Sequence, residues 1–121
     1  MIQANELIVG NLLNFDRFGE IRIFKIDPDH IRMCFDFNDE FNLYYKPIPI
    51  TESWLLSFGF EQRDHLWSID IDRYNKIYYN SDQKILFSGQ LGFSIQHDIT
   101  YIHQLQNLYF ALTQKELTLN E

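Results

Sequence analysis

Two acidic residues stand two positions apart on one expected strand, a spacing that could hold a cation. Asp70 and Asp72 alternate there with apolar residues, so both carboxylates project from one strand face, about 6.5–7 Å apart. Such a pair could bind a divalent cation or support acid–base chemistry in a weak hydrolase. Outward acids on a half-buried strand are also ordinary on solvated faces, and no third acid or histidine follows in register. Both interpretations stay open.

The histidines and the single cysteine lack the spacing of a metal site. His97 and His103 are the nearest pair of histidines, and their separation matches no standard ligand spacing. Cys34 has no second cysteine, which excludes an internal disulfide. Arg32 would lower the pKa of its thiol and Asp36 would oppose that, so a Cys–His enzyme is an alternative. We expect no catalytic residue, no metal ligand and no cofactor.

Acidic and aromatic side chains are interleaved in the segment 35–45. The acids are Asp36, Asp39 and Glu40, and the aromatic residues among them are Phe35, Phe37, Phe41, Tyr44 and Tyr45. Carboxylates spaced along a strand and turn can imitate a phosphate backbone and occupy a cationic groove. A solvated hairpin tip with core aromatic residues behind it is the alternative. The three acids are therefore candidate partner-binding residues.

The segment 101–117 is expected to form an amphipathic helix with one uncharged outer face. At about 100° per residue, its apolar residues gather on one side of the helix. The opposite side carries His103, Asn107, Phe110 and Gln114, and no formal charge stands between the first and last of these. Interfaces are depleted of charged residues, so we expect these four side chains to contact a partner protein or a second copy in a homodimer. Burial by the same chain is the alternative.

Composition and charge narrow the function classes. The chain has 121 residues, 45% of them hydrophobic, which is enough for one folded domain. Its 17 acidic and 10 basic residues give a net charge of −7. Direct nucleic-acid binding is disfavoured because it draws on a surplus of lysine and arginine. No segment approaches the ~20 apolar residues of a membrane helix. With no secretory signal at its start, the chain is expected to be soluble and cytoplasmic.

Short antiparallel strands and two helices should position these residues. Alternation predicts strands at 12–15, 21–26, 31–37 and 41–45, and further strands at 67–71, 77–79, 85–87 and 91–95. Thr51 is a good N-cap for a short helix that ends near Gly59. The expected fold is α+β, mostly antiparallel, as one compact domain over 1–121. It comprises a barrel-like β lobe over 1–50, and a part over 51–121 in which the C-terminal helix packs across a second sheet.

Three blocks resemble a small-protein family of Bacteroidetes genomes, their phages and other mobile elements. The blocks are Asn5–Asn11, Pro47–Phe60 and Tyr101–Leu117, and they cover about a third of the chain. The family has no established activity and defines no catalytic residues, so the resemblance carries no site residue over. Its members usually show glycine after the helix threonine, whereas this chain has Gln114. That departure predicts a helix that runs on past Thr113.

The chain is also similar in size and character to anti-CRISPR proteins directed at type VI-B RNA-guided ribonucleases. This resemblance implies a stoichiometric inhibitor that engages the effector protein or its guide-RNA site. The leading hypothesis is therefore a non-enzymatic phage or mobile-element protein that binds and inhibits a host protein. The alternative is a small β-barrel module that binds RNA or single-stranded DNA through exposed aromatic residues such as Tyr44, Tyr78 and Tyr79.

Overall fold

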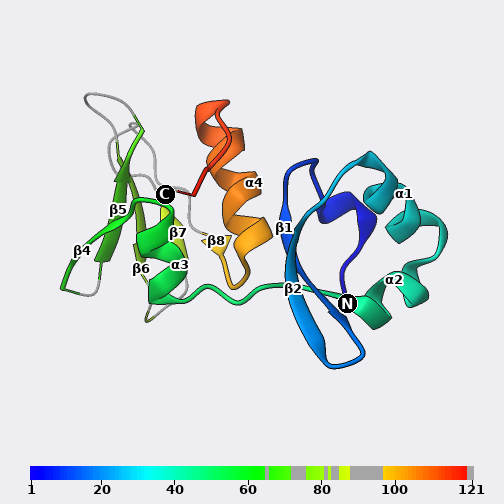
Figure 1. Cartoon of the computed structure of the whole chain (residues 1–121). Coiled ribbons are helices and arrows are strands. Elements are labelled where there is room, and N and C mark those ends of the chain that lie inside the picture. The colour runs from blue at the N-terminus through cyan, green and yellow to red at the C-terminus, as the bar shows by residue number, and fades with distance from the viewer. Residues whose placement is uncertain (65, 72–75, 81, 83–84, 88–96, 120–121) are drawn as a thin grey trace. The chain divides into compact units, whose positions relative to one another are not determined.

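The structure is a computed structural model that describes residues 1–64, 66–71, 76–80, 82, 85–87 and 97–119 (Figure 1). Across these residues the fold is α+β, with two antiparallel sheets and several helices. The chain divides into two compact units. The first comprises Met1–Pro49 and Tyr101–Leu108, and the second comprises Ile50–Thr100 and Tyr109–Glu121.

The first unit is built on a three-stranded antiparallel sheet in the order β2-β1-β3. Strands β1 (Leu12–Arg17) and β2 (Glu20–Lys25) form a hairpin, and β3 (Tyr45–Lys46) pairs with the other side of β1. The hairpin turns at Phe18 and Gly19, whose φ angles of 55° and 80° are both left-handed. A two-residue turn of this kind matches the twist of its strands, and it favours glycine at one position. The predicted strands at 12–15 and 21–26 are confirmed.

Helices follow the hairpin where the sequence predicted two more strands. After the short 3-10 helix η1 (Ala4–Glu6) and the hairpin come α1 (Pro28–Asp36) and α2 (Asn38–Tyr44). The Asp27 carboxylate caps α1 by accepting a hydrogen bond from the His30 amide at 3.1 Å, and Pro28 begins the helix. Asp at the N-cap and proline next to it are typical of a helix start. The prediction of strands at 31–37 and 41–45 was wrong. Over 31–37 this cap outweighs a short run of alternating residues, whereas α2 has Phe37 at its N-cap with no side-chain cap hydrogen bond.

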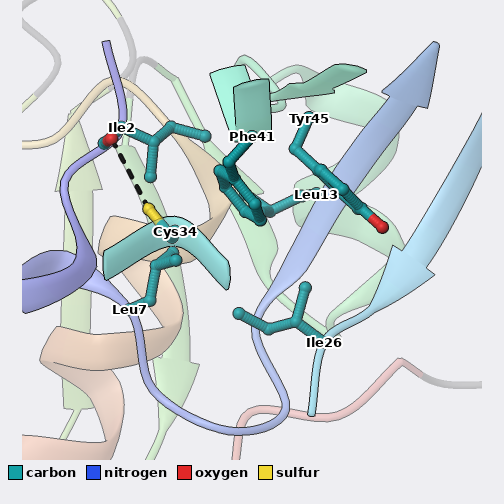
Figure 2. Packing of buried hydrophobic residues seen from close by; sticks show 7 residues of the cluster. All are labelled: Ile2, Leu7, Leu13, Ile26, Cys34, Phe41 and Tyr45. Carbon is teal, nitrogen blue, oxygen red and sulfur yellow. Dashed lines mark hydrogen bonds between the residues drawn. The ribbon is translucent and has the colours of Figure 1, made fainter. Parts of the chain in front are cut away.

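The core of the first unit forms where the two helices meet the sheet (Figure 2). Its buried members are Ile2, Leu7, Leu13, Ile26, Cys34, Phe41 and Tyr45. The rings of Phe41 and Tyr45 stack with centroids 4.4 Å apart, and the Cys34 thiol donates to the Ile2 carbonyl at 3.7 Å. The barrel-like lobe expected over 1–50 was therefore wrong. Helices cover one face of an open three-stranded sheet, and no closed barrel exists among the described residues.

The second unit holds a five-stranded antiparallel sheet and a short helix. The helix α3 (Glu52–Ser57) begins at Thr51, whose hydroxyl accepts from the Trp54 amide. The sheet has the order β4-β5-β6-β7-β8, with strands Glu61–Arg63, Leu66–Asp70, Lys76–Asn80, Ile85–Phe87 and His97–Asp98. The short helix predicted between Thr51 and Gly59 and the strands predicted at 67–71, 77–79 and 85–87 are confirmed. The strand predicted at 91–95 lies outside the described residues.

The last helix, α4 (Ile102–Thr113), contributes residues to both units. Its first amide, that of Ile102, donates to the Ile48 carbonyl at 2.8 Å. Its residues up to Leu108 belong to the first unit, and those from Tyr109 onward belong to the second. The helix stops at Thr113 instead of running on. Gln114 adopts a φ of 60°, the left-handed conformation that glycine usually supplies after a helix.

Candidate protein-binding surface

His103 lies inside the first unit, although the sequence placed it on the outer face of α4. It is 1% exposed, and neither ring nitrogen has a hydrogen-bond partner. The Tyr101 ring stacks beside it, with centroids 6.1 Å apart and planes at 13°. Burial lowers the pKa of the His103 imidazole, while the charge of Glu6 opposes that shift. The prediction that His103 contacts a partner is therefore wrong, because its side chain has almost no surface to offer.

Amide side chains of α4 bind the main chain of the first unit. Asn107 donates to the Glu6 carbonyl at 2.7 Å and accepts from the Asn11 side chain at 2.7 Å. Gln106 accepts from the Leu12 amide at 2.8 Å and donates to the Gly10 carbonyl at 3.3 Å. The prediction that Asn107 faces a partner is corrected, since the chain itself occupies both ends of its amide. Each of these two positions needs a side chain that both donates and accepts a hydrogen bond, which explains why it carries a neutral amide and no charge.

The remaining two residues of the predicted helix face are exposed and lie in the second unit. Phe110 is 41% exposed, and Gln114 is exposed at the end of α4. They stay candidate contacts, but the two residues predicted with them are held by the first unit. The uncharged face is thus not one continuous open surface.

The acidic residues predicted as contacts do lie on an exposed surface. Asp36, Asp39 and Glu40 are all exposed where α1 ends and α2 begins. Exposed apolar residues surround them, with Phe35 at 78%, Phe37 at 58% and Leu43 at 65% exposure. We name these six residues the acidic–aromatic corner. It is built from a junction of two helices, whereas the sequence suggested a hairpin tip with its aromatic residues turned inward.

Interactions within the two helices explain the positions of the three acids in this corner, but they do not explain the exposed phenylalanines. Asp39 and Glu40 lie in the first turn of α2, where acids favour the positive end of the helix. Asp36 pairs with Arg32 at 3.6 Å, one helical turn earlier. A groove of about 360 Å³ opens beside Phe35, lined by Gln3, Ala4, Asn5, Cys34, Phe35 and Asn38. A partner protein can place a side chain in such a groove and pack it against the exposed ring.

Residues of the β1–β2 hairpin form a second exposed apolar surface that the sequence reasoning missed. Phe18 is 92% exposed, and Ile21 and Ile23 on β2 are 66% and 54% exposed. The Arg17 guanidinium lies 4.9 Å from the centroid of the Phe18 ring and 5.9 Å from that of Tyr44. The alternation of β2 suggested an inward face, but it could not show that this strand lies at a sheet edge.

Among the residues of the alternative functions, Tyr79 is buried and Tyr78 is half-buried, whereas Tyr44 and Asp70 are exposed. The Tyr79 side chain is 2% exposed and donates to the Ile99 carbonyl at 3.2 Å, whereas Tyr44 is 39% exposed. Asp70 pairs with Lys76 at 3.4 Å, and Asp72 is outside the described residues. Within the described part of the chain, no three histidine, cysteine or acidic side chains are grouped as metal ligands would be.

Cys34 is a packed core residue. It is 1% exposed, and its burial raises the pKa of the thiol, an effect that a hydrogen bond from Asn38 partly opposes. A thiolate is the nucleophilic form of cysteine. At neutral pH this side chain therefore acts as a small apolar group between α1 and the N-terminal segment.

Comparison with protein-family models, with curated proteins and with solved structures finds no match to this chain. None of the described helices combines the length and the apolar character that crossing a membrane requires. The exposed side chains of the two units are therefore the observations that bear on function.

Proposed function

We propose that this chain is a non-enzymatic interaction protein that binds a partner protein through the acidic–aromatic corner and inhibits it. The observation that carries the proposal is the exposure of Phe35 and Phe37 beside three exposed carboxylates. A large aromatic side chain stabilises a complex when a partner removes it from water. The carboxylates around the rings select a partner whose surface is basic.

The partner that fits this chemistry has a cationic groove with apolar walls. A protein that holds RNA lines its channel with lysine and arginine because phosphates dominate the affinity. Asp36, Asp39 and Glu40 supply carboxylates that would take the place of phosphates in such a channel. The net charge of −7 adds long-range attraction toward it.

The most specific form of the proposal is an inhibitor of a type VI-B RNA-guided ribonuclease, carried by a phage or mobile element of Bacteroidetes and acting in the host cytoplasm. The resemblance of the sequence to anti-CRISPR proteins supports this target, and the charge of the corner suits a guide-RNA channel. The inhibitor would act in a stoichiometric complex with the effector protein or its guide-RNA complex.

The test is a titration of a purified type VI-B effector, with and without guide RNA, by isothermal calorimetry. The wild-type chain should bind and suppress RNA cleavage, and its affinity should fall as salt rises, because surface charges are screened. The variant Asp36→Asn, Asp39→Asn, Glu40→Gln should bind more weakly at low salt and respond less to salt. Absence of binding would reject this target. A wild-type affinity that is independent of salt would reject the role of the carboxylates.

Single-stranded RNA or DNA is a second candidate ligand, and one observation favours it. Arg17 lies within cation–π distance of both Phe18 and Tyr44, and aromatic rings with arginine can stack on bases. A gel-shift titration with guide RNA and unrelated RNA, with no partner protein present, separates the two functions. A mobility shift that Tyr44→Ala and Arg17→Ala abolish would favour nucleic-acid binding over the protein partner.

A further inference from the structure

The open edge of β2 carries a sequence that is complementary to itself. We propose that two copies of this chain pair antiparallel through β2, across a two-fold axis at Ile21. This inference concerns the hairpin and does not depend on the acidic–aromatic corner or on the partner proposed for it. It rests on the position of β2 in the sheet, on the order of its residues, and on their exposure.

Strand β2 lies at the edge of its sheet. Among the described residues it pairs with β1 only, and all six of its residues are exposed. The turn makes Arg17 and Glu20 the closing pair of the hairpin. Since hydrogen-bonded pairs alternate along an antiparallel ladder, Ile21 and Ile23 direct their N–H and C=O groups toward the open edge. Such an edge is a template for another strand.

The two-fold axis limits which residues can face each other. For two edge strands in one continuous sheet, the axis is perpendicular to the sheet and passes through a residue that faces its own copy. With Ile21 on the axis, Glu20 of each copy faces Arg22 of the other. Phe24 of each copy then lies beyond these pairs, level with the turn of the other copy. Opposite charges therefore flank the central pair of isoleucines, which stabilises a strand pair.

The other registers are less favourable. With Arg22 on the axis, the two guanidinium groups would face each other, and like charges directly opposite destabilise a strand pair. With Ile23 on the axis, Arg22 would face Phe24, and Glu20 would face the apolar Ile26. Of these three registers, only the one at Ile21 places both Glu20 and Arg22 opposite a residue of the other sign.

Glu20 and Arg22 lie on the same face of β2, as the register at Ile21 requires. Alternate residues share a face, and the Phe18, Glu20, Arg22 and Phe24 side chains line one groove of about 200 Å³ together with Phe15 and Arg17. Glu20 and Arg22 already pair within one strand at 3.3 Å, and their side chains are 75% and 72% exposed. A second copy would complete a cluster of four alternating charges beside this groove.

The contact is short, so the dimer should be weak. One pair of short strands buries less than the roughly 1,000 Å² of a stable interface. We therefore expect dimerisation in the micromolar range. Sedimentation equilibrium from about 5 µM to about 1 mM covers that range.

Charge reversal tests the register. Glu20→Arg and Arg22→Glu should each weaken dimerisation about tenfold or more, because each places like charges opposite one another twice. The double variant Glu20→Arg, Arg22→Glu restores both pairs and should return the dissociation constant to within about twofold of wild type. Glu61→Arg and Arg63→Glu are matched controls on the exposed edge strand β4, with the same spacing and charge changes, and should leave dimerisation unchanged.

Three results would overturn the proposal: a monomer at every concentration, single variants that dimerise like wild type, or a double variant that stays monomeric. Each single variant also loses the Glu20–Arg22 pair within its own strand, so its fold is checked by circular dichroism. A second measurement needs no variant. Hydrogen exchange of the Ile21 and Ile23 amides should slow as the wild-type concentration rises, and exchange rates independent of concentration would also overturn the proposal.

Discussion

At the scale of single residues, His103 shows how a polar side chain becomes part of an apolar interior. The side chain is 1% exposed, and both ring nitrogens lack hydrogen-bond partners. A buried polar group without a partner destabilises a fold by about 1–3 kcal/mol. The imidazole tolerates this position only while it is neutral, because burial lowers its pKa. This residue should therefore couple folding to pH.

We predict that the variant His103→Leu removes a component of acid sensitivity. The unfolded chain binds a proton at His103 near its usual pKa of 6.5, and the native state binds it only at lower pH. Stability from the neutral ring is thus fully present above pH 6.5 and is lost as pH falls toward the native pKa. The loss is at most about 1.4 kcal/mol per pH unit.

Urea unfolding of wild type and variant from pH 8 to pH 5 measures this difference. Other titrating groups contribute to both proteins, so the gap between the two curves isolates His103. The gap should widen in favour of leucine as pH falls below 6.5. Parallel curves would show that the imidazole does not titrate differently in the folded and unfolded chain.

At the scale of elements, local cap chemistry decided where helices begin and end. The cap at Asp27 starts α1 over residues whose alternation favoured a strand, and Thr51 starts α3 as predicted. At the other end of a helix, Gln114 takes a left-handed conformation, with φ of 60°. Most side chains adopt that conformation at a cost of about 1 kcal/mol or more. Glycine adopts it without that strain.

The variant Gln114→Gly should therefore stabilise the chain by about 0.5–1 kcal/mol. The side chain is exposed, so its removal should cost little packing. Lys115→Gly is the control, because Lys115 is exposed and does not have a positive φ. Urea unfolding at pH 7.5 measures both changes. A loss of stability in Gln114→Gly equal to that in the control would contradict the account of how α4 ends.

Helices and strands could be predicted from the sequence where all local signals favoured the same secondary structure. The strands β5, β6 and β7 of the second unit and the β1–β2 hairpin followed from alternation bounded by turns, whereas β4 and β8 were not predicted. Over 31–37 the alternation favoured a strand, whereas the cap at Asp27 and Pro28 favoured a helix. The chain forms the helix α1 there, which buries Cys34 in the core. Periodicity could not resolve that competition, because a helix of this length has room for little of its own pattern.

At the scale of the whole molecule, the exposure of the acidic residues in the acidic–aromatic corner could be predicted, but the environment of the α4 face could not. Asp36, Asp39 and Glu40 are exposed because charges avoid burial without a partner. The lack of charge on α4 predicted contact with a partner. Asn107 and Gln106 instead make hydrogen bonds to main-chain groups of residues 6–12. These hydrogen bonds depend on which main-chain groups the sheet leaves unpaired, and only the tertiary structure shows them.

The central claim is that the acidic–aromatic corner binds a partner protein, and its most direct test is the affinity of Phe35→Ser for the type VI-B effector. Leu56→Ser is the matched control, since Leu56 on α3 is 61% exposed and lies in the second unit. Calorimetry should show Phe35→Ser binding at least about tenfold more weakly than wild type, as expected for a central aromatic contact. Leu56→Ser should bind within about twofold. Equal affinities of the two variants would contradict the claim.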